Sequence, residues 1–276
     1  MRKLLPCSAL LFLFWVPALS DTPTPDRDQR KLVFRTPFPI WTVPAMANTP
    51  GRFGAHFKTR VVIYNPTLFS YLISAKLYGP NGAVAVRSIA IEREQYLVWD
   101  NFLEDVFNYR GAGAVEFDSW FDPPGGSDDY EYSITAEVYT DSPNGRYSTV
   151  VIDGDGSDAV FFGSRAIPGL VVVNPGITVN EMQRVNVGLF NEWPGTSTIL
   201  AHVGDAEGNI VQTIEFNVPA YSWAQKTITA RVENGFVSWT CETSTCAAYL
   251  WAVTVDNQSN DGRFLPPIHY TPHDDP

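Results

Sequence analysis

The chain has few of the side chains on which most catalytic and metal sites depend. Only four histidines and three cysteines occur among its 276 residues. It lacks the nucleophile elbow G-x-S-x-G, the zinc-protease motif H-E-x-x-H, a P-loop and a dinucleotide-binding G-x-G-x-x-G loop. These absences argue against the enzyme classes that such motifs identify, so we interpret the chain as non-catalytic. A carbohydrate-active enzyme that uses two carboxylates stays as an alternative, because it needs no histidine.

Basic side chains are also scarce. The sequence has 19 Lys and Arg against 30 Asp and Glu, a net charge of −11. Nucleic acids and anionic membrane surfaces are bound through Lys and Arg, so this balance argues against both as partners. It permits solubility and cation binding without demonstrating either.

Long hydrophobic runs are missing, apart from a short one near the N-terminus. Arg2 and Lys3 precede an apolar stretch at residues 10–16, and small residues follow. This pattern predicts a secretory signal peptide over residues 1–20, cleaved after Ser20 or, alternatively, after Ala18. Residues 21–30 are polar and proline-rich and predict a disordered lead-in. We expect a secreted, periplasmic or cell-surface protein with no membrane span after cleavage.

Two cysteines remain after cleavage, Cys241 and Cys246. Export makes a disulfide between them the expected state. The C-x4-C spacing suits a hairpin whose turn is residues 242–245. Free thiols and a metal site are the alternatives, although two cysteines without a second pair make a poor zinc site.

The chain nearly repeats itself. Asn65 ends the strand-like run 59–65, and Asn191 ends the similar run 185–191, at an offset of 126 positions. The same offset maps residues 75–82 onto 201–208. A match that keeps its register across two turns indicates two copies of one folding unit.

Strand patterns recur at short intervals in both copies. They predict strands at residues 31–34, 59–64, 72–78, 83–91, 114–117, 132–140 and 146–152, and again at 160–162, 185–190, 199–203, 210–218, 237–239 and 247–256. A strand near residues 95–99 is followed by one or two helical turns that end before Gly111. We therefore expect an all-β protein of two tandem, antiparallel, immunoglobulin-like β-sandwiches related by internal duplication, over residues 31–156 and 157–270, with a flexible tail at 271–276.

Several motifs mark turns and strand ends. They are Val43-Pro44-Ala45-Met46, Gly51-x-x-Gly54-x-x-Phe57-x-Thr59 leading to Tyr64-Asn65-Pro66, Val173-Asn174-Pro175-Gly176, and Val255-Asp256-Asn257-Gln258-Ser259-x-Asp261-x-x-Phe264-x-Pro266. In these stretches the chain resembles exported bacterial proteins built of tandem β-sandwich repeats. The resemblance covers most of the mature chain and implies that fold, but no activity and no catalytic residues. The second copy departs from the pattern at Glu192-Trp193, where the first keeps Asn65-Pro66.

Two acidic stretches are candidates for calcium, which prefers several oxygen ligands from one loop. The first is the polar linker with Asp153, Asp155 and Asp158; the second is the loop with Asp118, Asp122, Asp128, Asp129 and Glu131. We favour the alternative that each stretch is solvated surface, which is the more common role of such clusters. The tail with His269 and His273 offers a further, adventitious metal site.

Other residues suggest recognition or architecture. Trp193, Trp120 and Phe121 stand in turn-like segments where aromatics can contact a protein or glycan, unless they fold back onto the core. Asp141 with Arg146, and Asp256 with Arg263, recur in the two copies, so we expect each arginine to tie down the final hairpin of its copy. The sequence as a whole predicts an exported, non-catalytic binding, adhesion or spacer protein, or a calcium-stabilised surface module.

Overall fold

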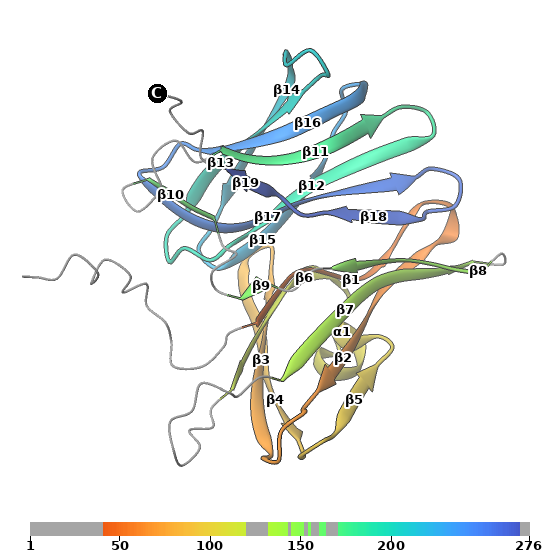
Figure 1. The fold of residues 1–276 in the computed structure, drawn as a ribbon, viewed down its shortest axis with the longest axis vertical. Helices are drawn as coiled ribbons and strands as arrows, with labels where there is room; N and C mark the ends of the chain where they lie inside the picture. The colour runs from red at the N-terminus through yellow and green to blue at the C-terminus, as the bar shows by residue number, and fades with distance from the viewer. Residues whose placement is uncertain are drawn as a thin grey trace, which may run out of the picture. The chain divides into compact units, whose positions relative to one another are not determined.

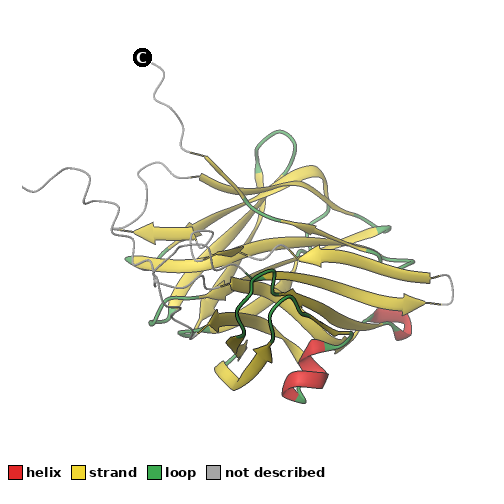
Figure 2. Ribbon diagram, turned by 60° about the horizontal axis from the view of Figure 1, so that its bottom comes forward, coloured by secondary structure: helices red, strands yellow, loops and turns green. Residues whose placement is uncertain are grey.

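Strands make up most of the described residues of the protein, which we describe from a computed structural model (Figures 1 and 2). The structure describes residues 41–119, 132–142, 145–151, 154–155, 160–163 and 171–270. Within these ranges the sheets are antiparallel and the one α-helix has six residues. No helix in the described part of the chain has the length and apolar character needed to cross a bilayer. The all-β prediction is confirmed.

The first half, residues 41–155, forms one continuous sheet. Its strands run in the order β4-β3-β6-β1-β2-β7-β8, with β5 added on β2 and β9 on β1. A 3-10 turn, η2 (Arg52–Gly54), and the helix α1 (Phe102–Phe107) lie between strands. The strands are β1 Trp41–Pro50, β2 His56–Tyr64, β3 Tyr71–Gly79, β4 Gly82–Ile91, β5 Tyr96–Trp99, β6 Gly111–Ser119, β7 Ser133–Ser142, β8 Gly145–Val151 and β9 Gly154–Asp155.

The second half, residues 160–270, forms two five-stranded sheets. One has the order β10-β17-β12-β15 with β18 on β17, and the other has the order β14-β13-β16-β11-β19. The strands are β10 Val160–Gly163, β11 Val171–Val179, β12 Gln183–Asn191, β13 Ser197–Gly204, β14 Ile210–Val218, β15 Ser222–Thr227, β16 Val232–Cys241, β17 Thr245–Asp256, β18 Gly262–Leu265 and β19 Ile268–Tyr270.

Period-two alternation accounts for most of these strands. Val61 and Ile63 in β2 are fully buried, as are their counterparts Val187 and Leu189 in β12. Successive side chains of a strand point to opposite faces, so alternating apolar residues bury one face. The expected strand and short helix after residue 95 are confirmed as β5 and α1. The expected strand at residues 31–34 lies outside the described residues.

Two long strands, β1 and β11, were missed by the sequence analysis because each contains proline. Proline cannot donate a ladder hydrogen bond and is tolerated mainly at edges and bulges. The pairing of β1 with β6 shifts register between Val43 and Met46, on either side of Pro44. The pairing of β11 with β16 shifts between Pro175 and Ile177. A bulge therefore absorbs each proline inside a strand.

The hydrophobic core has two parts, one in each half. The first includes Val61, Phe102 and Phe117, and the second includes Phe190, Trp239 and Trp251. The second part extends into the first half, because Tyr78 of β3 and Ala114 of β6 belong to it. The Tyr78 and Phe190 ring centroids lie 5.0 Å apart. The two halves thus share buried apolar surface.

Hydrogen bonds reinforce this junction between the halves. The buried Trp223 indole of β15 donates through Nε1 to the carbonyl of Pro44 in β1, at 3.0 Å. The Phe264 amide of β18 donates to Thr149 Oγ1 of β8 at 2.8 Å. Asn260 Nδ2 donates to the Arg52 carbonyl at 3.4 Å. The described residues all fall within one compact unit, which these contacts explain.

Cys241 and Cys246 form a disulfide with a Cα–Cα distance of 6.5 Å. The predicted disulfide is present, but the predicted hairpin is wrong. Cys241 ends β16, which pairs with β11 and β13, whereas Cys246 lies in β17, which pairs with β10, β12 and β18. The segment between them passes from one sheet to the other. C-x4-C spacing limits the distance between the cysteines and does not require their strands to pair.

Candidate functional site

Most of the acidic candidates from the sequence fall outside the described residues. These are Asp122, Asp128, Asp129 and Glu131 of the long loop, and Asp153 and Asp158 of the linker. Asp155 is described only as a backbone position of β9, opposite Trp41 of β1. Trp120, Phe121 and the tail at 271–276 also lie outside the described residues. Calcium binding by these stretches therefore stays a prediction.

Asp118 is the one acidic candidate whose side chain is described. It lies in β6 with Oδ2 3.7 Å from Lys76 Nζ of β3. Among the described residues, no three His, Cys, Asp or Glu side chains come close enough together to hold a metal ion. Asp118 is thus one half of an ion pair in the described part of the chain.

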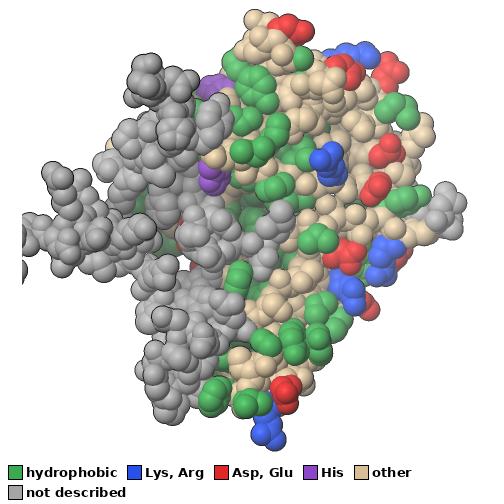
Figure 3. Space-filling model, viewed as in Figure 1, with side chains coloured by type: hydrophobic (Ala, Val, Ile, Leu, Met, Phe, Trp, Pro, Cys, Tyr) green, Lys and Arg blue, Asp and Glu red, His purple; other side chains and the backbone are tan. Residues whose placement is uncertain are grey.

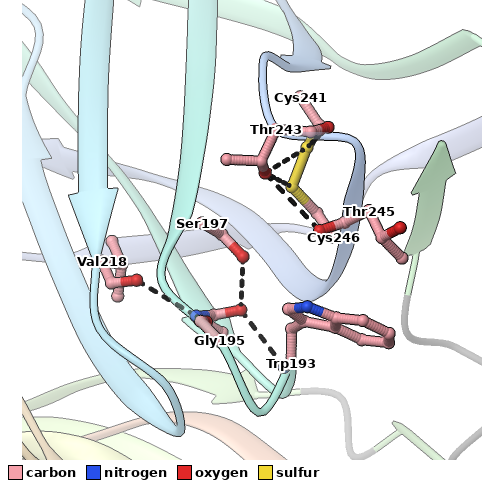
Figure 4. The surroundings of a disulfide bond; sticks show 9 residues. Trp193, Gly195, Ser197, Val218, Cys241, Thr243, Thr245 and Cys246 are labelled. Atoms are coloured by element: carbon pink, nitrogen blue, oxygen red, sulfur yellow. Dashed lines mark hydrogen bonds between the residues drawn. A yellow bond between two sulfur atoms is a disulfide. The ribbon is translucent and has the colours of Figure 1, made fainter.

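Trp193 lies in the surroundings of the disulfide (Figure 4). Its amide donates to Asn191 Oδ1 at 3.2 Å, and its ring is half-buried. A Cβ added to Gly195 would lie 3.3 Å from Trp193 Cδ1, so the ring covers this glycine. Trp193 is therefore partly folded back, and part of its surface stays exposed to solvent.

The two Asp–Arg pairs differ between the halves. Arg146 Nε lies 2.9 Å from Asp141 Oδ1, and its guanidinium stacks 3.9 Å from the Tyr139 ring centroid. In the second half, Arg263 stands opposite Thr254 in the β17–β18 register. The connection from Asp256 to Gly262 is longer than that from Asp141 to Gly145, which moves Arg263 away from the equivalent position.

Asp256 has a different role from Asp141. Its Oδ1 accepts hydrogen bonds from the Gln258 and Ser259 amides and the Ser259 hydroxyl, at 2.7–2.9 Å. Bonds from the Ser259 backbone and side chain hold the pKa of Asp256 below its ordinary value. Asp256 therefore shapes its own loop, and that loop presents Asn257 and Asn260 to the buried Arg184 guanidinium at 3.0 and 2.9 Å.

A charged cluster that the sequence analysis missed lies at the junction. We name it the junction cluster and define it as Lys76 and Tyr78 of β3, Glu116 and Asp118 of β6, and Glu192 after β12. Lys76 Nζ lies 2.7 Å from Glu116 Oε1, and Tyr78 donates to Glu116 Oε2 at 3.4 Å. Glu116 and Tyr78 are each only 8% exposed. Both oxygens of the Glu116 carboxylate are thus occupied inside the protein.

Glu192 brings a carboxyl group from the second half to this cluster. Burial, with a further contribution from the charge of Glu116, raises the pKa of Glu192 to about 7. Burial also raises the pKa of Tyr78, again with help from Glu116. Burial alone would lower the pKa of Lys76, but the hydrogen bond and charge of Glu116, with the charge of Asp118, raise it instead. The cluster can therefore exchange a proton at Glu192 near neutral pH.

Thr42 extends the cluster into β1. It stands directly opposite Glu116 in the β1–β6 register and is fully buried. Its Oγ1 is buried and has no hydrogen-bond partner among the described residues. One weak sequence signal pointed to this region, because Glu192 replaces the proline found at the equivalent place in the first copy. The cross-strand register that joins Lys76 to Glu116 was not visible in the sequence.

Two further surface features bear on recognition. Tyr64 and Tyr96 stack with centroids 4.2 Å apart, and Tyr96 is 63% exposed. A shallow depression of roughly 250 Å³ lies where the β3–β4 turn meets β14 and β15, lined by Pro80, Pro219 and Trp223 among others. On the face in view in Figure 3, acidic and basic side chains are interspersed. That face therefore offers no large area of a single charge sign.

The described geometry combines two tightly joined halves with a cluster of titratable groups at their junction, of which Glu116 and Tyr78 are buried. Such an arrangement can fix the relative position of two surfaces and respond to protons. Comparisons of the sequence with protein-family models and with curated proteins found no match.

Proposed function

We propose that this is an exported, non-catalytic protein whose two β-sandwich domains form a rigid spacer that presents binding surfaces outside the cell. The observation that carries the proposal is the junction, where the two halves share buried aromatic rings and the Trp223–Pro44 hydrogen bond. Rotation of one half would expose Tyr78 and Trp223 to water and leave polar groups without partners. Both changes are costly, so the junction favours one fixed orientation.

Equivalent strand orders support internal duplication. In the first half, β4-β3-β6-β1 lie side by side, and in the second half β14-β13-β16-β11 do so in the same sequence-related order. Likewise β8-β7-β2-β5 correspond to β18-β17-β12-β15. We infer that each half is one immunoglobulin-like sandwich, over residues 31–156 and 157–270.

The two repeated asparagines support duplication at atomic detail. Asn65 and Asn191 are both fully buried. Asn65 Oδ1 accepts from the Thr67 amide, and its Nδ2 donates to the Phe69 and Glu92 carbonyls. Asn191 forms the equivalent hydrogen bonds to residues at the same sequence spacings. Its partners are the Trp193 amide and the Gly195 and Val218 carbonyls, with Pro219 and Ser197 in addition.

Two glycines repeat in the same manner. A Cβ on Gly113 of β6 would lie 2.3 Å from the Tyr78 carbonyl oxygen of β3. A Cβ on Gly235 of β16 would lie 2.1 Å from the Gly204 carbonyl oxygen of β13. Both distances are too short for any side chain, so each glycine allows a close backbone approach at an equivalent place. Shared constraints of this kind support descent from one unit.

Export is supported by the N-terminal pattern and by the disulfide. Disulfides persist in oxidising compartments and are rare in the cytosol. We therefore place the mature protein in the periplasm, on the cell surface or in the medium. The resemblance to exported proteins of tandem β-sandwich repeats is consistent with that location. We assign a protein or glycan partner to two surfaces: the Tyr64–Tyr96 stack, in which Tyr96 is exposed, and the half-buried Trp193.

A distance measurement between the halves tests the rigid-spacer proposal. Cysteines introduced as R87C and E207C would carry spin labels on exposed sites of the two halves, since the native pair is already bonded. We expect one narrow distance distribution at pH 5.5. R87C with T135C in the first half, or E207C with E215C in the second, would report the spread that a single half gives. A distribution much broader than these controls would contradict the proposal.

One observation favours a second candidate function, a carbohydrate-active enzyme. Glu116 and Glu192 bring a carboxyl group from each half to one place, and their environments differ, as those of an acid and its partner carboxylate do. However, Glu116 is buried and bonded to Lys76 and Tyr78, so it faces the protein interior. Hydrolysis of any glycan in a broad panel that E192Q abolishes would favour the enzyme over the spacer.

A further inference from the structure

The two sulfurs of the disulfide differ in their access to solvent. Cys241, at the end of β16, is partly exposed and packs against the edge of the core, whereas Cys246 of β17 is fully buried inside it. A dissolved thiol therefore reaches Cys241 and not Cys246. Attack on one sulfur of a disulfide expels the other. The difference in exposure thus makes Cys241 the sulfur that is attacked and Cys246 the leaving group.

Thr243 lies beside both sulfurs, in the short segment between β16 and β17 (Figure 4). Its Oγ1 is 2.8 Å from Cys246 Sγ, 3.1 Å from Cys241 Sγ and 3.5 Å from the Thr245 carbonyl oxygen. A disulfide has no S–H group, so the Thr243 hydroxyl is the donor in either sulfur contact. The shorter contact is to Cys246, the sulfur that takes up the negative charge when Cys241 is attacked.

The same segment suits both sulfurs once the S–S bond is broken. Hydrogen bonds to charged groups are stronger than those to neutral ones, so the Thr243 hydroxyl stabilises a Cys246 thiolate more than the disulfide. The Thr243 carbonyl oxygen lies 3.1 Å from Cys241 Sγ, where it would accept a hydrogen bond from a Cys241 thiol. The segment is also held from outside, because the Glu242 amide donates to the Thr198 carbonyl at 2.9 Å. Thr243 is therefore in place before any exchange begins.

We propose that Cys241–Cys246 is a thiol-exchange site, at which an external thiolate becomes attached to Cys241. The thiolate sulfur attacks Cys241 Sγ, and the bond between Cys241 and Cys246 breaks as the new S–S bond forms. Cys246 leaves as a thiolate that accepts a hydrogen bond from Thr243. The attacking sulfur is oxidised and Cys246 is reduced, and no net proton moves. The inference goes beyond the spacer proposal and does not depend on it.

Attachment of a thiol would open the covalent link between the two sheets of the second half. Cys241 and Cys246 belong to different sheets, so only the chain segment between them would still connect these strand ends covalently. Trp193 lies in the surroundings of the disulfide, so the attached group would stand near a surface that we assign to a partner (Figure 4). The cysteines are five positions apart, which keeps Cys246 close enough to expel the thiol again. The exchange is therefore reversible.

Glutathione is the probe that identifies the sulfur under attack. Folded, mature wild-type protein would be incubated with reduced glutathione at mildly alkaline pH, quenched with acid, then denatured, alkylated with N-ethylmaleimide and mapped by peptide mass spectrometry. We expect glutathione on Cys241 and N-ethylmaleimide on Cys246. The initial rate should rise in proportion to the glutathione concentration. Glutathione on Cys246, no adduct on the folded protein, or a rate that reaches a plateau because it waits for unfolding would each overturn the proposal.

Variants of the connecting segment test the part played by Thr243. Thr243→Val keeps the shape of the side chain and removes the hydroxyl. We expect its initial exchange rate to fall about tenfold, because the departing thiolate loses a charge-assisted hydrogen bond. Thr243→Ser restores the hydroxyl and should restore the rate. Ser244→Ala, which removes an exposed hydroxyl from the same segment, should react like wild type.

The two experiments answer separate questions about the site. Equal rates in wild type and T243V, or equal slowing in T243S or S244A, would show that the Thr243 hydroxyl does not support the leaving sulfur and would overturn the proposed mechanism. The position of glutathione in the wild-type protein does not depend on the folding of any variant. A broad spin-label distribution between the halves would overturn the rigid spacer and leave the thiol-exchange site untouched, because the site lies wholly within the second half.

Discussion

The two halves have equivalent strand orders, but their strands are joined into a different number of sheets. In the first half, Asn48, Thr49 and Pro50 of β1 pair with β2, which joins all strands into one sheet. In the second half, β11 and β12 are connected by a turn at Asn180 and belong to separate sheets. The first half adds the helix α1, which buries Phe102 and Leu103, whereas the described residues of the second half contain no helix. The second half instead has the inter-sheet disulfide.

Residues that recur in both halves have a different role from residues found in only one of them. Features that recur, such as Asn65 with Asn191 and Gly113 with Gly235, hold each unit together. Among the residues found in one half only, Trp223, Tyr78 and Glu192 belong to the contact between the halves. We therefore favour residues found in one half only as candidates for the function of the protein.

The largest expected effect comes from breaking the contact between the halves. Trp223→Ala would remove a ring that is 8% exposed, its stacking on Trp251 and its hydrogen bond to Pro44. We expect a loss of about 3–5 kcal/mol in the free energy of unfolding, typical of a buried tryptophan. Urea denaturation would measure it. Trp193→Ala, at a half-buried position, is the matched control and should cost much less; equal losses would contradict the assigned role of Trp223.

An intermediate effect is expected from the repeated asparagines. Asn65→Ala and Asn191→Ala each remove a fully buried side chain that hydrogen-bonds several backbone groups, and losing buried hydrogen bonds of this kind costs about 1–3 kcal/mol. We expect each variant to lose about 3 kcal/mol, with Asn191→Ala the more severe, because Asn191 satisfies three carbonyls and Asn65 two. Thermal and urea unfolding would compare them. If only one variant is destabilised, the two asparagines do not play equivalent roles.

The sequence predicted most strands and the disulfide because these depend on local patterns. Alternation marked β2 and β12, and an Asn-Gly turn marked the β3–β4 hairpin. It could not predict β1 and β11, since the effect of Pro44 and Pro175 depends on bulges that form only in the paired sheet. Nor could it predict the junction cluster, because Lys76 and Glu116 meet through strand register and Glu192 arrives from another sheet.

The smallest expected effect distinguishes the two final hairpins. Arg146 pairs with Asp141 and stacks on Tyr139, but it is well exposed, so Arg146→Ala should cost no more than about 1 kcal/mol. Arg263, opposite Thr254, lacks the equivalent aspartate, and Arg263→Ala should cost less. The Arg146 effect should shrink further in 1 M salt, which screens the ion pair. A larger loss of unfolding free energy for Arg263→Ala, one that shrinks in salt, would show that Arg263 also forms an ion pair. The two hairpins would then differ less than their register indicates.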